Sequence, residues 1–309
     1  MKCYNKRKKG GLFLRPLHEL LLEDYWTVGF RFYQGEEDSV LGGQGKKAFS
    51  FLKADARYWY ADPFLFEKDG RTFLFVEMFD NKTELGCIGC SEFIDGCFQK
   101  PAVVLREAFH LSYPFVFEED ARILMMPETS GDGCIQLYEC THFPDQWQKQ
   151  KVLVRRPGAV DTVLTGSCLI TSVVDSAAQK TTHLEFYDYP SGRKIETETR
   201  FEPDQTSRGA GRVFLHGGEP IRPSQNGTGG EYGRGVFFNQ IIRLGEDYAE
   251  RRIASLTPDE LETGRIKATG LHTYARNDSI EVVDIKSQRF NIRRLLWILA
   301  KKLKLTTAS

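Results

Sequence analysis

The stretch DPFLFEKDGRTFLFVE, residues 62–77, decides the fold, because a copy of it follows 51 residues downstream. It consists of two apolar-rich segments around Lys-Asp-Gly, which is typical of two strands joined by a tight turn. The copy, YPFVFEEDARILMMPE at residues 113–128, is identical at seven of sixteen positions and also ends on glutamate. A period near 50 residues built from short strands and turns is typical of β-propeller blades.

Three weaker copies extend the repeat along the chain, with starts at Asp161, Gly211 and His272. Long amphipathic helices are missing from residues 25–285, which argues against an α/β fold. We therefore predict an all-β fold, a five-bladed β-propeller, in which the segment Trp26–Tyr33 pairs with the last blade and closes the ring. The alternative is a β-sandwich, which shares the strand spacing but has no reason to contain a fixed copy.

Charge is distributed unevenly along a chain of 309 residues whose formal net charge is zero. Residues 1–18 carry six Lys or Arg, residues 285–309 carry seven, and neither range contains Asp or Glu. A neutral protein with an acidic body is an unlikely match for phosphate backbones, so we expect no nucleic-acid partner. The basic ends instead favour an anionic surface as a partner.

The two ends are predicted to be extensions of the propeller: a basic N-terminal segment at 1–24 and a basic amphipathic C-terminal helix at 286–309. In that helix the apolar residues fall on one face, which favours binding at an anionic membrane interface. The alternatives are packing on the propeller and binding of a partner protein. The sequence shows no apolar run of membrane-span or signal-peptide length, so we expect a cytoplasmic protein, peripheral on the inner membrane face.

The acidic residues of the repeat suggest a site on the propeller axis. Asp62, Tyr113 and Asp161 start their units, while Glu77 and Glu128 end the second strand of theirs. Equivalent positions of successive blades point to one axis, where like charges push pKa values apart. One neutral and one ionised carboxyl group are what cleavage or formation of a glycosidic bond requires. The alternative for each acid alone is a turn, a cap or a solvated rim residue.

At these residues the sequence resembles the N-terminal domain of glucosamine inositolphosphorylceramide transferases. The similarity covers about residues 50–285 and rests on several ordered motifs: Tyr60-Ala-Asp-Pro-Phe64, Phe75-Val-Glu77, His110-Leu-Ser-Tyr-Pro-Phe-Val-Phe117, Met126-Pro-Glu-Thr129, Phe143-Pro-Asp-Gln-Trp147, Ala210-Gly-Arg212, Arg222-Pro-Ser-Gln-Asn226 and Tyr232-Gly233. Bacterial relatives of that domain have envelope-polysaccharide functions. The domain in turn looks like the five-bladed superfamily of arabinanases and invertases.

This resemblance implies roles for three of the repeat positions. Asp62 falls where those glycosidases have their base or nucleophile. Tyr113 replaces a second-blade Asp that usually tunes the site. Asp161 lies in the third blade, which usually supplies a glutamate as the acid, and Glu128 comes from a different blade. These departures argue against ordinary furanoside hydrolysis and leave a sugar-handling cleft whose chemistry is either altered or lost.

Further candidates for substrate binding follow the fourth unit or precede a blade. An arginine guanidinium can bind an anion through two parallel N–H groups, and amide side chains can form hydrogen bonds with sugar hydroxyl groups. The candidates are Arg212, Arg222, Gln225, Asn226, His110 and His272. Glu77 is a further candidate, either as a sugar ligand or as a residue that tunes the site. The alternative for the arginines is an ion pair to the acidic rim, and for each histidine a structural role. Cys87-x2-Cys90 lacks a second pair at zinc-finger spacing, so we predict neither a metal nor a cofactor.

Together these observations predict a carbohydrate-active enzyme of cell-envelope glycan biosynthesis or modification. Glycosyl transfer or glycoside hydrolysis would use Asp62, Glu128 and Asp161 as the acids, and the substrate would be a sugar or glycan, possibly lipid-linked. The alternative is a non-catalytic glycan-binding or scaffold module that serves a separate glycosyltransferase. Carboxyl groups about 5–10 Å apart would favour the enzyme, whereas acids held in ion pairs with arginine would favour the scaffold.

Overall fold

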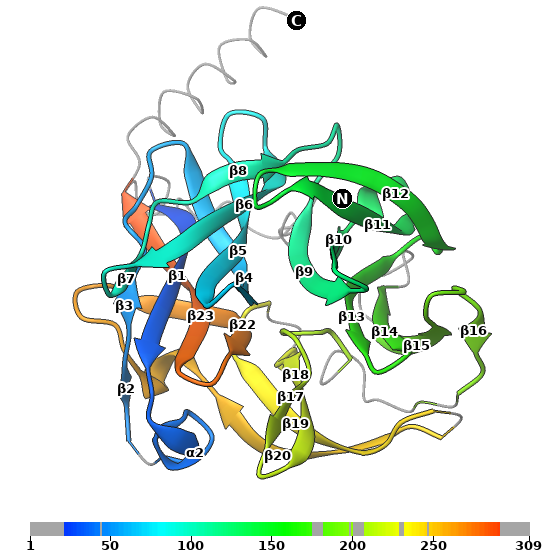
Figure 1. The fold of residues 1–309 in the computed structure, drawn as a ribbon. Coiled ribbons are helices and arrows are strands. Elements are labelled where there is room, and N and C mark those ends of the chain that lie inside the picture. Colours follow the sequence, from blue (N-terminus) through cyan, green and yellow to red (C-terminus); the bar gives the residue numbers. More distant parts are fainter. Residues whose placement is uncertain are drawn as a thin grey trace, which may run out of the picture.

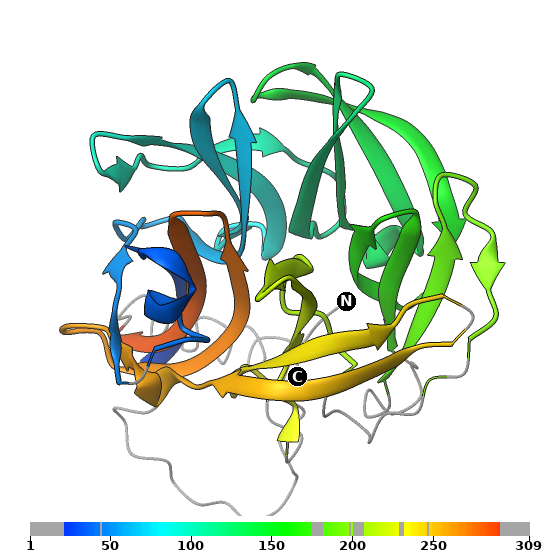
Figure 2. The same cartoon turned by 60° about the horizontal axis from the view of Figure 1, so that its bottom comes forward.

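The computed structural model describes residues 22–43, 45–174, 182–197, 199, 207–228, 232–245 and 247–290. Five sheets stand around a central axis, each with one strand edge toward the axis, as Figures 1 and 2 show. The prediction of a five-bladed propeller is therefore confirmed. Of the predicted C-terminal helix at 286–309, residues 286–290 belong to strand β23, and the rest lies outside the described residues.

The first three blades follow one another along the chain, each starting with its innermost strand. Blade 1 consists of β4 (Tyr58–Lys68), β5 (Arg71–Asp80), β6 (Leu85–Ile94), β7 (Cys97–Phe98) and β8 (Ala102–Leu105). Blade 2 consists of β9 (Ser112–Glu119), β10 (Arg122–Glu128), β11 (Cys134–His142) and β12 (Gln146–Arg155). Blade 3 consists of β13 (Ala159–Thr165), β14 (Cys168–Val174), β15 (Thr182–Asp188) and β16 (Lys194–Ile195).

The last two blades complete the ring. Blade 4 consists of β17 (Phe214–His216), β18 (Glu219–Gln225), β19 (Val236–Arg243) and β20 (Ala249–Leu256). Blade 5 consists of β22 (Ala268–Arg276), β23 (Ile280–Phe290), β1 (Leu22–Phe32) and β3 (Ser50–Phe51). Short connecting elements are the helices α2 (Gly35–Asp38), η1 (Ser130–Asp132) and η3 (Pro258–Glu260) and the parallel pair of β2 (Lys47–Ala48) and β21 (Leu261–Glu262).

Blade 5 joins the two ends of the described chain. β1 pairs antiparallel with β23 from Leu22 opposite Phe290 to Phe32 opposite Ile280. This confirms the predicted closure of the ring by the segment Trp26–Tyr33 and extends it. At one end of this ladder, Leu22 belongs to the predicted N-terminal extension and Phe290 to the predicted C-terminal tail. Parts of both predicted extensions are therefore strands of blade 5, where they contribute hydrogen bonds to one continuous ladder.

The inner strands share one irregularity, a β-bulge at the same place in four blades. In β4, β9, β13 and β22 two residues of the inner strand face a single residue of the next strand. They lie between Ala61 and Phe64, Ser112 and Phe115, Val160 and Val163, and Leu271 and Tyr274. The first residue of each bulge is, in turn, Asp62, Tyr113, Asp161 and His272. The first three have φ values of 48°, 50° and 52°, which cost energy in residues other than glycine and are typical of functional sites.

The hydrophobic core lies between neighbouring blades. The largest buried cluster joins the sheets of blades 1, 2 and 3, with Phe64, Phe115 and Val163 from the strand segment just after each bulge. Two smaller clusters join blade 5 to blade 1 and blade 5 to blade 4. Packing on both sides of every sheet fixes the inner strands, so the bulge residues are held in place from behind.

Candidate functional site

The bulge residues converge on the axis. The backbone N–H of Tyr113 in blade 2 donates a hydrogen bond to Oδ2 of Asp62 in blade 1, at 3.2 Å. The Tyr113 hydroxyl accepts from the N–H of Gly211 at 2.7 Å and donates to its carbonyl oxygen at 3.2 Å. Gly211 precedes the inner strand of blade 4, so Tyr113 bridges the channel and links three blades.

Asp62 is held by blade 5 as well. Its Oδ1 accepts a hydrogen bond from the Thr273 hydroxyl at 2.9 Å and lies 3.5 Å from Nε2 of His272. The other ring nitrogen of His272, Nδ1, lies 2.6 Å from Oδ2 of the fully buried Asp284. Asp284 also accepts from the backbone N–H groups of Asp62, His272 and Thr273 at 2.9–3.0 Å. One buried carboxylate therefore positions both the histidine and the catalytic candidate.

Burial and charge set the protonation of this pair. Burial raises the pKa of Asp62 to about 6, and the opposing effect of nearby His272 limits the rise. For His272, burial lowers the pKa, but Asp284 and Asp62 outweigh it and the net pKa is raised. An imidazolium between two carboxylates is the state that this geometry favours.

Glu128 enters the same site from the end of β10. The residue as a whole is half-buried, and its carboxyl group accepts a hydrogen bond from the Ser130 hydroxyl at 2.7 Å. Burial, followed by the charge of Asp161, raises the pKa of Glu128 to about 7. The charge of Asp62 acts on the same carboxyl group. Near pH 6.5, a proton on Glu128 can therefore coexist with an ionised Asp62.

Asp161 differs from the other two acids, because an arginine holds it. Nε and Nη2 of Arg208 both donate to its carboxylate, the second at 3.0 Å. Asp161 is 4 % exposed, while the Arg208 side chain is 24 % exposed. In this fork geometry Arg208 holds the Asp161 carboxylate at two points, while the Arg208 side chain stays partly exposed.

Glu77 and His110 form a separate pair between blades 1 and 2. Nδ1 of His110 accepts a hydrogen bond from the N–H of Gly86 at 2.9 Å, so the proton of a neutral ring sits on Nε2. That nitrogen lies 3.3 Å from Oε1 of Glu77. Burial lowers the pKa of His110 to about 4, which keeps the ring neutral at physiological pH.

The other predicted binding residues contact protein groups around the channel. Arg222 is 2 % exposed and donates to both carboxylate oxygens of Glu250 at 2.7 Å. Arg212 donates to the carbonyl of Val116 and lies over the ring of Phe115, and burial lowers its pKa to about 10. The amide groups of Gln225 and Asn226 bond to the backbone of Gly209 and Thr228. None of these contacts involves Asp62 or Glu128.

Sequence reasoning missed Arg208, Thr273 and Asp284. Asp284 had only a weak signal, because it is an acid of the second strand that lies opposite the bulge, one position before the register of Glu77 and Glu128. Arg208 had none, since it lies in an irregular segment before the fourth inner strand. Its pairing with Asp161 spans 47 residues and becomes apparent only when blades 3 and 4 are side by side.

Asp62, His272 and Asp284 also form a group that could hold a metal ion, with ligand atoms within 4.8 Å of one another. The short contact between His272 and Asp284 and the three N–H donors on Asp284 occupy most of these ligand positions. The trio therefore fits a hydrogen-bonded ion pair better than a metal centre. Cys87 and Cys90 are free, buried thiols.

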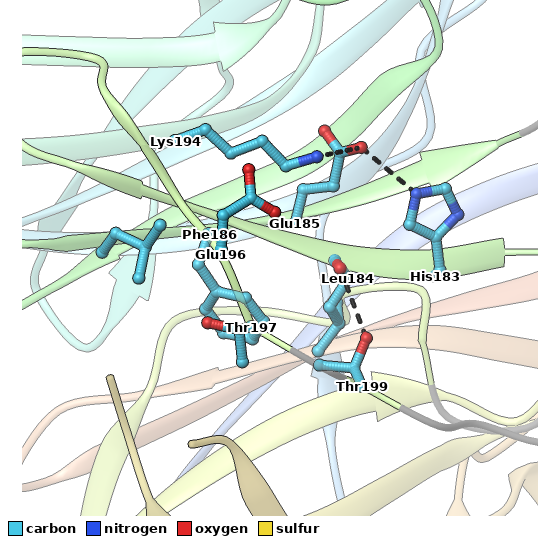
Figure 3. Close-up of a pocket in the computed structure, with 9 residues that line it drawn as sticks. His183, Leu184, Glu185, Phe186, Lys194, Glu196, Thr197 and Thr199 are labelled. Carbon is cyan, nitrogen blue, oxygen red and sulfur yellow. Dashed lines mark hydrogen bonds and ion pairs between the residues drawn. The ribbon is translucent and has the colours of Figure 1, made fainter. Parts of the chain in front are cut away.

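A cavity of 390 Å³ lies elsewhere, along β15 and β16 of blade 3 (Figure 3). Glu185 on its wall is bound by Arg156 and Tyr187 and faced by His183 and Lys194. Burial raises the pKa of Glu185, but these donors outweigh it and lower the pKa to about 2. None of the predicted site residues lines this cavity, so the cavity and the axial site are separate features.

Comparisons with known proteins agree with this fold. The catalytic domain of Coprinopsis cinerea GH62 α-L-arabinofuranosidase superposes with a TM-score of 0.54 and 12 % sequence identity, over 77 % of this chain and 93 % of that one. At this identity the likeness shows the fold alone.

Curated relatives come from plants. Glucosamine inositolphosphorylceramide transferase 1 of Oryza sativa subsp. japonica is 31 % identical over 224 residues, and that of Arabidopsis thaliana is 32 % identical over 244 residues. The matches cover 68 % and 74 % of this chain but 30 % and 31 % of those proteins. The family model "Glucosamine inositolphosphorylceramide transferase 1, N-terminal" matches residues 52–291. Because that match takes in most of the propeller, the chain belongs to the glucosamine inositolphosphorylceramide transferase 1 N-terminal family.

Proposed function

We propose that the chain is a carbohydrate-active enzyme of cell-envelope glycan biosynthesis or modification, with its reaction centre on the propeller axis. The observation that carries the proposal is a pair of carboxyl groups in one site, Asp62 with a pKa of about 6 and Glu128 with a pKa of about 7. Such a pair supplies the ionised and the protonated group that a glycosidic bond needs. Family membership and the sugar-related names of the relatives support it.

In this reaction Glu128 donates its proton to the glycosidic oxygen as the bond to the sugar breaks. Asp62 takes the proton of the attacking hydroxyl, which belongs to water in hydrolysis and to an acceptor alcohol in transfer. His272, fixed by Asp284, faces the Asp62 carboxylate and stabilises its charge. The nearby charge of Asp161 favours the protonated form of Glu128, and the charge of Arg208, the partner of Asp161, opposes that effect.

The substrate class follows from the relatives. Their names give a glucosamine group and an inositolphosphorylceramide acceptor, so we propose a sugar carried on or transferred to a lipid-linked, phosphate-containing glycan. The chain spans about three tenths of those proteins, so the complete reaction is part of the proposal.

A second candidate is a glycan-binding or scaffold module for a separate glycosyltransferase. The ion pair between Asp161 and Arg208 favours it, because that acid is unavailable for proton transfer. Within the described residues neither Asp62 nor Glu128 forms an ion pair with an arginine, which favours the enzyme.

Turnover assays separate the two candidates. The wild type, Asp62→Asn and Glu128→Gln are incubated with UDP-N-acetylglucosamine plus inositol-phosphate acceptors, and with glucosaminyl-inositol and arabino-oligosaccharides. Turnover that disappears in both folded variants supports the enzyme. Sugar binding without turnover supports the module, and equal turnover in all three proteins contradicts the proposed roles of both acids.

We also propose that the basic C-terminal segment brings the protein to an anionic membrane surface from the cytoplasmic side. The support comes from the sequence alone, namely the positive charge of the segment and the periodic spacing of its apolar residues. The residues after Phe290 lie outside those that the structure describes. In the part of the chain that the structure describes, no helix is long and apolar enough to cross a membrane. Flotation with anionic liposomes, with and without residues 288–309, is the test; equal binding by both proteins would contradict it.

A further inference from the structure

Tyr232 is an exposed aromatic residue beside the buried axial site. Its side chain is 52 % exposed, although its ring packs edge-on against His272, with centroids 5.0 Å apart, and against Trp26, at 6.1 Å. Trp26 in turn covers His272 at 4.2 Å. An aromatic ring that is anchored on one side and open on the other presents a fixed apolar face to solvent.

The backbone around Tyr232 is pinned to blade 5. The carbonyl of Gly233 accepts a hydrogen bond from the N–H of Leu271 at 2.7 Å, and Arg234 forms a bridge to the same residue. Gly233 has a φ of 77°, and a Cβ there would lie 2.9 Å from the Trp26 indole. The turn at Gly233 therefore packs closely against Trp26, and it is hydrogen-bonded to Leu271, the residue just before the bulge at His272. The position of the Tyr232 ring is thus coupled to the geometry of the axial site.

The surroundings of the ring are polar and charged. Nε2 of His272 lies 3.5 Å from Asp62, and the Tyr232 phenol acts on the pKa of Arg208, the partner of Asp161. A ligand on Tyr232 would thus meet an apolar surface on one side and charged hydrogen-bonding groups on the other. A sugar ring has this division, with C–H groups on its faces and hydroxyl groups at its edge.

We propose that Tyr232 is the stacking platform for the sugar ring that is presented to Asp62. The inference rests on the proposed function and deepens it by assigning the sugar subsite. The C–H groups of the sugar lie on the negative face of the phenol ring, and its hydroxyl groups face the partly exposed Arg208 side chain. Trp26 supports the platform from behind without touching the sugar.

The test is isothermal titration with glucosaminyl-inositol, UDP-N-acetylglucosamine and arabinotriose. The proteins are the wild type, Tyr232→Phe, Tyr232→Leu and Tyr232→Ala. Because stacking needs a flat ring, Tyr232→Phe should bind within about threefold of the wild type. Tyr232→Leu and Tyr232→Ala should weaken binding at least about tenfold, which corresponds to about 1.4 kcal/mol. Leu215→Ala, which truncates a 63 % exposed side chain of β17, is the matched control and should bind as the wild type does.

Thermal unfolding of each variant separates lost binding from lost folding, and Tyr232→Leu keeps the proposal testable if the alanine variant unfolds. If the wild type binds a probe and Tyr232→Leu and Tyr232→Ala bind it equally well, Tyr232 is not the stacking platform, and the proposed function still stands. Binding of no probe by the wild type would overturn the proposed function together with the platform. Equal losses in Tyr232→Phe and Tyr232→Ala would assign the effect to the hydroxyl group and contradict stacking.

Discussion

Replacement of Glu128 by glutamine should change the pH dependence of stability, because burial keeps this carboxyl group protonated in the folded chain. Its pKa rises from the ordinary 4.5 to about 7. At about 1.36 kcal/mol for each pKa unit, ionising the group in the folded protein costs about 3 kcal/mol. The folded state keeps the proton up to about pH 7, whereas the unfolded chain releases it near pH 4.5. The wild type therefore loses stability as the pH rises between these values.

Glu128→Gln has no proton to lose and escapes this cost. Denaturation at about pH 4 and about pH 8 should show its advantage over the wild type growing by about 3 kcal/mol, or about 6 °C in Tm at about 2 °C per kcal/mol. Glu118→Gln removes an exposed carboxylate from the neighbouring strand and should follow the wild type at both pH values. Parallel pH curves for Glu128→Gln and the wild type would refute the protonated, desolvated state of Glu128.

Three further outcomes follow from the axial site. Asp62→Asn should abolish turnover and keep the fold; full activity would remove Asp62 from the mechanism. The pH profile of kcat/KM should be bell-shaped, rising near pH 6 as Asp62 ionises and falling near pH 7 as Glu128 loses its proton, and a flat profile would contradict these roles. Tyr113→Phe should cost about 1–2 kcal/mol in denaturant titrations, because the buried N–H and C=O of Gly211 lose their partner; an unchanged midpoint would contradict the bridge.

The blades were predictable from the sequence because each copy of the repeat corresponds to one blade. A repeated strand–turn–strand unit predicts one sheet per copy, and equal spacing places Asp62 and Tyr113 at the same bulge. The start of the third unit at Asp161 and of the fifth at His272 also coincide with bulge positions. These positions recur because the channel wall needs the same bend in each inner strand.

Partners across blades were not predictable, because no local pattern records them. Asp161 and Arg208 are separated by 47 residues. Their ion pair depends on how the sheets of blades 3 and 4 pack. The sequence therefore showed which acidic residues are candidates for the axis. Tertiary contacts decide whether each of them is paired with a cation or is available for proton transfer.

A crystal structure of Glu128→Gln with glucosaminyl-inositol or arabinotriose would test the axial sugar site. The geometry predicts a sugar ring on the propeller axis, with its anomeric carbon between Asp62 and residue 128 and one face on Tyr232. Sugar bound in the blade 3 cavity beside Glu185 instead, with the axis empty, would contradict a carbohydrate site built from the repeated bulge residues.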